Sequence, residues 1–88
     1  LTLIRIDPET GRLTTIGTYA FDGILPEAAV WDASSSFVAV VNYDQLDLER
    51  EGGSIDFWKL VTAPSPILVK LRRSFPTPHG PHSIVRAN

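Results

Sequence analysis

The run FVAVVN, Phe37 to Asn42, decides the fold of this chain. Successive side chains of a β-strand point to opposite faces. Here the odd positions carry Phe, Ala and Val, and the even positions carry Val and Val, so both faces are apolar. This pattern is typical of a strand that is covered on both sides. We therefore expect further structure to pack against each face.

Six more short runs have strand character, because they are rich in β-branched and aromatic residues and are bounded by Gly, Pro, Asp and Ser. They are Leu1 to Asp7, Arg12 to Ala20, Ala28 to Asp32, Ser54 to Leu60, Ile67 to Ser74 and Ser83 to Arg86. The turn Pro8 to Gly11 joins the first two as an antiparallel pair. A helix over Pro26 to Ala33 is the alternative for the third, since proline suits a first helical position. The sequence predicts an all-β chain.

A weak internal repeat relates the strands. TLIRID from Thr2 resembles SIDFWK from Ser54, 52 positions later. In the same way, the segment PEA from Pro26 resembles PHS from Pro81, 55 positions later. Such a period is close to that of kelch-like β-propeller repeats, and the repeating unit is four strands.

The repeat predicts a β-propeller fragment made of four-stranded antiparallel blades. Residues 1–22 supply the two outer strands of one blade, residues 23–78 one complete blade, and residues 79–88 the start of the innermost strand of the next. A blade buries both faces against its neighbours, which accounts for the apolar character of Phe37 to Asn42. The expected partners are the remaining blades of a longer protein or other copies of the chain. The strand-like runs at both ends also suggest a piece of something longer.

Composition narrows the function classes. The chain has 88 residues, 43% hydrophobic and 20% charged, which is a globular composition. A net charge of -2 provides no basic face to bind phosphate groups. We therefore expect neither nucleic acid nor a membrane surface to be a partner. No apolar run is long enough to span a bilayer. The chain has no cysteine, so disulfide content cannot indicate the cellular compartment. We expect a soluble protein, with the cytoplasm as the favoured location.

Four segments together resemble the lactonase-type seven-bladed β-propellers: VVNYD from Val40, GGSIDFW from Gly52, RIDPETGRL from Arg5 and HGPHSI from His79. That family includes propeller-type 6-phosphogluconolactonases and 3-carboxymuconate cyclases. The chain departs from the family pattern in two places. Eight residues, 44–51, follow the Asn-Tyr pair, and Gly80 replaces the first histidine of a His-Pro-His-Ser motif.

The resemblance implies that His82 is the catalytic residue. A histidine exchanges protons near neutral pH, as lactone opening or closing requires. In an antiparallel blade, His82 at the start of one inner strand should meet Asn42 and Tyr43, at the end of the neighbouring strand, on one rim of the central channel. The alternative for His82 is a loop histidine that bonds backbone groups.

The other candidate substrate-binding residues are Asn42, Tyr43, His79, Glu27 and Arg86. Glu27 occupies the repeat position of His82, and the family's anionic substrates suit a guanidinium such as that of Arg86. Asn42 and Tyr43 have structural alternatives, a loop cap and a packed ring. We expect no metal, because His79 and His82 lack an identifiable third ligand, and no cofactor.

These observations predict a fragment of a lactonase-like enzyme that hydrolyses or forms a lactone of a small anionic sugar acid or muconate-type acid. Two alternatives stay open, since a fold does not fix a function. One is a non-catalytic propeller that serves as a binding scaffold, and the other is a piece that is inactive on its own.

Overall fold

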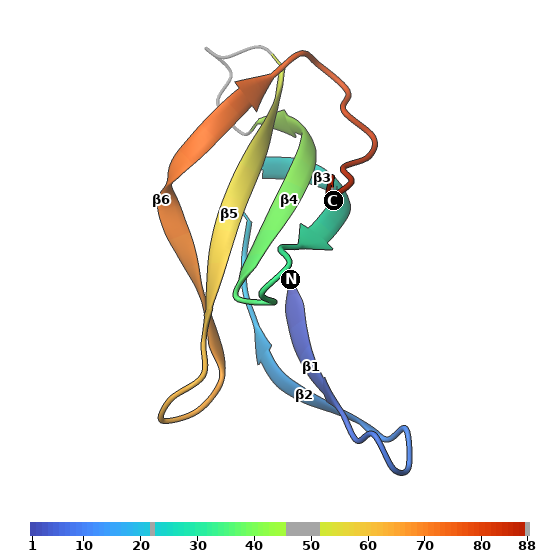
Figure 1. Cartoon of the computed structure of the whole chain (residues 1–88). Helices are drawn as coiled ribbons and strands as arrows, with labels where there is room; N and C mark the ends of the chain where they lie inside the picture. Colours follow the sequence, from blue (N-terminus) through green and yellow to red (C-terminus); the bar gives the residue numbers. More distant parts are fainter. Residues whose placement is uncertain (22, 46–51, 88) are drawn as a thin grey trace.

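The computed structural model describes residues 1–21, 23–45 and 52–87. In this part of the chain all regular structure is β, without a helix, and the strands form two antiparallel sheets (Figure 1). The strands are β1 (Thr2–Ile6), β2 (Leu13–Thr18), β3 (Gly23–Trp31), β4 (Phe37–Gln45), β5 (Gly53–Val61) and β6 (Ile67–Thr77).

Six of the seven predicted strands are confirmed, several with wider bounds. The helix considered for residues 26–33 is wrong, because β3 pairs along its length with β4. The strand predicted at Ser83 to Arg86 is also wrong. Residues 78–87 contain no strand, because a strand needs a hydrogen-bonded neighbour and no strand in the described part of the chain pairs with this segment. Conversely, β6 runs on to Thr77, beyond the predicted end at Ser74, because Phe75 still pairs with Ile55.

The larger sheet is a meander in which each strand pairs with the next along the chain, in the order β3-β4-β5-β6. We call this sheet the blade, a name that refers here to the four strands β3 to β6 alone. In its register Val38 lies opposite Trp58, and Asn42 lies opposite Ser54. Facing residues share one side of a sheet, so the register fixes which side chains belong to each face of the blade.

The β1-β2 hairpin covers one face of the blade. The buried cluster on this face consists of Val38, Val40, Trp58 and Leu68, and residues from both ends of the hairpin, including Leu1, Leu3, Tyr19 and Phe21, pack against it. The Tyr19 and Trp58 rings meet edge to face, with 5.9 Å between centroids. The Tyr19 hydroxyl also accepts a hydrogen bond of 3.0 Å from the Leu68 backbone N–H. The cover expected on this side of Phe37 to Asn42 is therefore present.

The opposite face of the blade is covered in part. Ala39 and Val41 are buried there, but Phe37 is 37% and Phe75 is 40% exposed. The segment after β6 turns back past the β3 and β4 end of the sheet (Figure 1). Cover on this face is thus present around Ala39 and Val41 and incomplete at Phe37, where β4 begins, and at Phe75, near the end of β6.

Two aspartates organise the turns. In the β3-β4 turn, the Asp32 carboxylate accepts hydrogen bonds from the Ser34 hydroxyl and from the backbone N–H groups of Ser36 and Phe37. The Ser34 hydroxyl first, and then the Phe37 N–H, lower the pKa of Asp32 to about 2. In the β1-β2 turn, the backbone N–H of Glu9, followed by that of Thr10, lowers the pKa of Asp7. Such Asx turns fix the chain reversals that keep each hairpin in register.

Nothing in the described part of the chain is a helix long and apolar enough to cross a membrane.

Candidate functional site

Three aromatic side chains gather where β4 ends. The Tyr43 ring contacts the imidazole of His79, with 4.8 Å between centroids, and that of His82, with 5.6 Å between centroids. The backbone joins them as well, because the Gly80 N–H donates a hydrogen bond of 3.2 Å to the Tyr43 carbonyl oxygen. Two histidines that lie three positions apart are therefore held against one ring.

Gly80 makes this approach possible. Its φ of 79° lies in the left-handed region, and a Cβ atom at this position would lie 3.1 Å from the Tyr43 ring. A side chain at position 80 would therefore strain the backbone and press on the ring.

Asp44 adds a carboxylate to the group. Its Oδ2 atom lies 3.9 Å from His79 Nδ1, and the two side chains are 37% and 58% exposed. The pair is ionic only when the imidazole is protonated. We call Tyr43, Asp44, His79 and His82 the histidine cluster. Exposed imidazoles can accept and donate protons, which is the chemistry of a general acid or base, and Asp44 lies beside one of the two, that of His79.

Asn42 does not join the histidine cluster. Its side chain belongs to the face of the blade opposite Tyr43, since adjacent residues of a strand alternate, and it is fully buried. The amide nitrogen donates to Ser54 Oγ at 3.1 Å and to Asp56 Oδ2 at 2.9 Å. Ser74 Oγ donates to the other oxygen of Asp56. We call the buried residues Asn42, Ser54 and Asp56, together with Ser74, which is exposed and bonds to Asp56, the buried polar cluster.

The space around Asn42 is tightly filled. A Cβ atom on Gly23 would lie 2.4 Å from Asn42 Cγ, so a glycine is required beside the amide. The Asn42 Oδ1 atom is buried and has no hydrogen-bond partner among the residues that the structure describes. This amide therefore has the surroundings of a structural group, enclosed by the protein itself.

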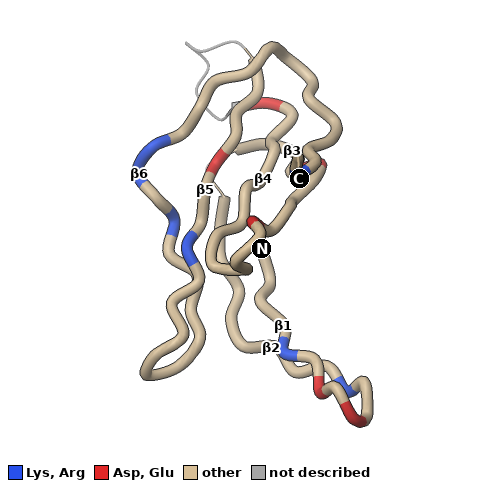
Figure 2. The backbone as a smooth tube through the Cα atoms, viewed as in Figure 1, with Lys and Arg blue, Asp and Glu red and all other residues tan. Residues whose placement is uncertain are grey.

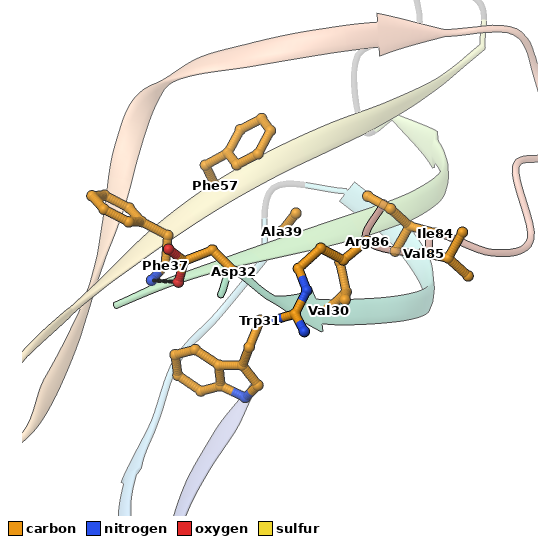
Figure 3. A pocket seen from close by; sticks show the side chains of 9 residues that line it. All are labelled: Val30, Trp31, Asp32, Phe37, Ala39, Phe57, Ile84, Val85 and Arg86. Atoms are coloured by element: carbon orange, nitrogen blue, oxygen red, sulfur yellow. Dashed lines mark hydrogen bonds between the residues drawn. The ribbon is translucent and has the colours of Figure 1, made fainter. Parts of the chain in front are cut away.

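Glu27 and Arg86 lie apart from each other. Glu27 is exposed and sits where the β3 register shifts, next to Pro26, which pairs with Asn42. It is thus at the same end of the sheet as Tyr43. Arg86 is also exposed and lines an open groove of about 190 Å³ that includes Phe37, at the other end of β4 (Figure 3).

The groove lies between the blade and the segment after β6. Its walls are mostly apolar, and Figure 3 shows Arg86 reaching over Val30 and Trp31. The residues around it are Val30, Trp31, Asp32, Phe37, Ala39, Phe57, Ile84, Val85 and Arg86. Phe37, Ala39 and Phe57 belong to the partly covered face of the blade, and Ile84, Val85 and Arg86 belong to the segment after β6.

Sequence reasoning missed Asp44 in the histidine cluster, and Ser54, Asp56 and Ser74 in the buried polar cluster. The sequence marks Asp44 only as the first residue of a polar stretch. A signal for Asp56 was present, because it lies two positions before Trp58 and so shares the apolar face of its strand. A carboxylate at such a position needs hydrogen-bond donors around it.

The described residues include no group of three or more His, Cys, Asp or Glu side chains placed to hold a metal ion. No protein-family model, curated protein or solved structure matches this chain.

Proposed function

We propose that these residues are part of a β-propeller, in which the remaining blades or other copies of the chain cover the exposed half of the blade. Three features support this proposal. The blade is a four-stranded antiparallel meander, a hairpin covers one of its faces, and large apolar side chains such as Phe37 and Phe75 stay exposed on the other. Closed packing of blade on blade would bury these side chains. Such an assembly would be a soluble protein, with the cytoplasm as the favoured compartment.

Within this fold we assign lactone chemistry to the histidine cluster: the protein would hydrolyse or form a lactone of a small anionic sugar acid or muconate-type acid. The observation that carries the assignment is the contact of both imidazoles, His79 and His82, with the Tyr43 ring. It puts two proton-exchanging groups at the end of a strand where a ligand can approach them. The resemblance to lactonase-type propellers supplies the substrate class.

In hydrolysis, the His82 imidazole would take a proton from water as the water oxygen attacks the lactone carbonyl carbon. The ring C–O bond then breaks, and the imidazolium returns the proton to the leaving oxygen. In lactone formation from an unsaturated acid, the carboxylate oxygen adds to the double bond, and the protonated imidazole delivers a proton to carbon. His79, beside Asp44, would assist by binding substrate oxygens.

The anionic group of the substrate would be bound by Arg86. This residue follows His82 by four positions, a separation of at most about 14 Å along an extended chain. A small sugar acid could lie between the two side chains. Glu27, exposed at the Tyr43 end of the sheet, is a second acid or base for the same site.

The test compares the wild-type protein with His82→Ala in two assays, hydrolysis of 6-phosphogluconolactone and cyclisation of 3-carboxymuconate. Loss of a general acid or base should lower kcat/KM by about 10²- to 10⁴-fold. Val85→Ala is the matched control, since Val85 lies on the same segment and is 85% exposed. Equal kcat/KM for wild type and His82→Ala would refute the catalytic assignment.

The same samples distinguish the alternatives. Binding of 6-phosphogluconate without turnover would indicate a non-catalytic scaffold. Absence of both binding and turnover, together with a monomeric solution size, would indicate a segment that is inactive on its own.

A further inference from the structure

The middle of β6 departs from regular pairing. Asp56 pairs with Ser74 and Trp58 pairs with Lys70, so the single residue Phe57 faces three residues of β6. Such a bulge bends the strand and redirects its side chains. Figure 1 shows β6 bending away from β5 at this point. Arg72 and Arg73 lie in the bulge, and both are exposed.

Two cationic side chains near the bulge lie over aromatic rings. The Arg73 guanidinium lies over the Phe75 ring, 4.8 Å from its centroid, and the Lys59 ammonium lies 6.0 Å from the centroid of Phe37. Contacts of this kind restrict a long side chain at an exposed site. We call Lys59, Arg72 and Arg73 the basic bulge.

No exposed carboxylate balances these charges on the same strands. All residues of β5 and β6 are described, and their one acidic residue, Asp56, is 3% exposed and bonded to Asn42 and Ser74. Figure 2 shows the cations gathered on β5 and β6, away from the acidic residues of the β1-β2 turn. The chain as a whole is negative, with a net charge of -2, so this positive surface is local.

We propose that the basic bulge is a docking site for an acidic segment of another protein, rich in Asp or Glu. Charge complementarity carries the proposal, since exposed guanidinium groups bind carboxylates in a forked geometry. The acidic segment would be recognised through side chains and not through backbone pairing. A partner strand added along β6 would meet the bent backbone at the bulge and the Leu68 N–H, which already donates to Tyr19.

Two other occupants fit the surface less well. A second copy that paired β6 with β6 would place like charges together, which is destabilising. A nucleic acid would need a broad basic face, and the net charge of the chain opposes that. The docking site is separate from the histidine cluster, so it does not depend on the proposed lactone chemistry. It does lie beside Phe37 and Phe75, which a neighbouring blade would bury, so it requires the outer edge of this face, at β6, to stay open in the propeller.

The experiment measures binding of a fluorescent peptide of alternating Glu and Ser, with a central proline that prevents strand pairing, to the full chain by anisotropy. The test variant is Arg72→Glu with Arg73→Glu. The matched control is Arg5→Glu with Arg12→Glu, which makes the same charge change at two exposed positions of the β1-β2 hairpin. Circular dichroism of both variants establishes that the β-structure is retained.

We expect the Arg72 and Arg73 variant to weaken binding about tenfold and the control to change it less than about twofold. Added salt should weaken wild-type binding, as for exposed charges. Equal loss in both variants would attribute binding to net charge alone and overturn the proposal. Three other results would also overturn the proposal. They are binding only by the same peptide without its central proline, self-association of the chain through β6, and tighter binding of a duplex DNA than of the peptide.

Discussion

The amide nitrogen of Asn42 lies 2.9 Å from a carboxylate oxygen of Asp56, and both side chains are buried. Asn42 is on β4 and Asp56 on β5, and the second carboxylate oxygen accepts from Ser74 on β6. One carboxylate therefore links three strands of the blade. Buried polar groups stabilise a fold when their hydrogen bonds are made and destabilise it when a partner is lost.

Replacement of this carboxylate should therefore be costly. Asp56→Ala removes the acceptor of the Ser74 hydroxyl and one acceptor of the Asn42 amide, and we expect the free energy of unfolding to fall by about 2 to 4 kcal/mol. Ser74→Ala removes one donor only and should cost about 1 kcal/mol. Urea denaturation measures both values. A smaller loss for Asp56→Ala than for Ser74→Ala would show that the carboxylate does not link the strands energetically.

Val40 tests whether the face beneath the β1-β2 hairpin is the stability core. Its side chain is 1% exposed and belongs to the cluster with Trp58 and Leu68. Val40→Ala should lower the free energy of unfolding by about 2 kcal/mol, because it removes buried methyl groups and leaves a cavity. The control Val85→Ala, at an 85% exposed position, should change it by less than about 0.5 kcal/mol. Similar values for the two substitutions would contradict this placement of the core.

The Asp32 carboxylate should make the free energy of unfolding depend on pH. Hydrogen bonds in the β3-β4 turn lower its pKa from 3.8 to about 2. Since the folded state favours the charged form, this contribution is present above pH 3.8 and is lost as the pH falls toward 2. Asp32→Asn should be less stable than wild type at neutral pH, and the difference, measured by urea denaturation, should shrink on acidification. A difference that stays constant from neutral pH to about pH 2 would mean that the charged form of Asp32 is not what stabilises the turn.

Tyr43 has two possible contributions to the proposed lactone chemistry, as a packed ring that positions the imidazoles or as a hydroxyl that binds substrate. Tyr43→Phe keeps the ring contacts with His79 and His82, whereas Tyr43→Leu removes them. We expect kcat/KM to stay near the wild-type value for Phe and to fall about tenfold or more for Leu, because misplacement of a catalytic group is costly. Equal losses in both variants would assign the effect to the hydroxyl.

Much of the blade could be predicted from local sequence. Strand positions followed from alternation and turn residues, and the two apolar faces of Phe37 to Asn42 correctly indicated a deeply buried strand. The prediction failed at Ser83 to Arg86. This run has strand character in isolation, but a strand exists only where a neighbour accepts and donates hydrogen bonds.

The candidate site was predictable in part for a related reason. That Tyr43 and His82 would meet followed from the antiparallel connection of the strands. Alternation along the strand also implies that the Asn42 side chain points away from them. Whether that side chain is buried or open to a ligand depends on residues from the neighbouring strands. Asp56 and Ser74, from two other strands, supply its surroundings.

By itself, the sequence determined the β-class, the turn positions and the residues that carry charge, because these depend on neighbours a few positions apart. Only the tertiary structure decided that Asn42 is enclosed, that Asp44 faces His79, and that Arg72 and Arg73 lie in a bulge. These relationships depend on strand register, and register is fixed by contacts between residues distant in the chain.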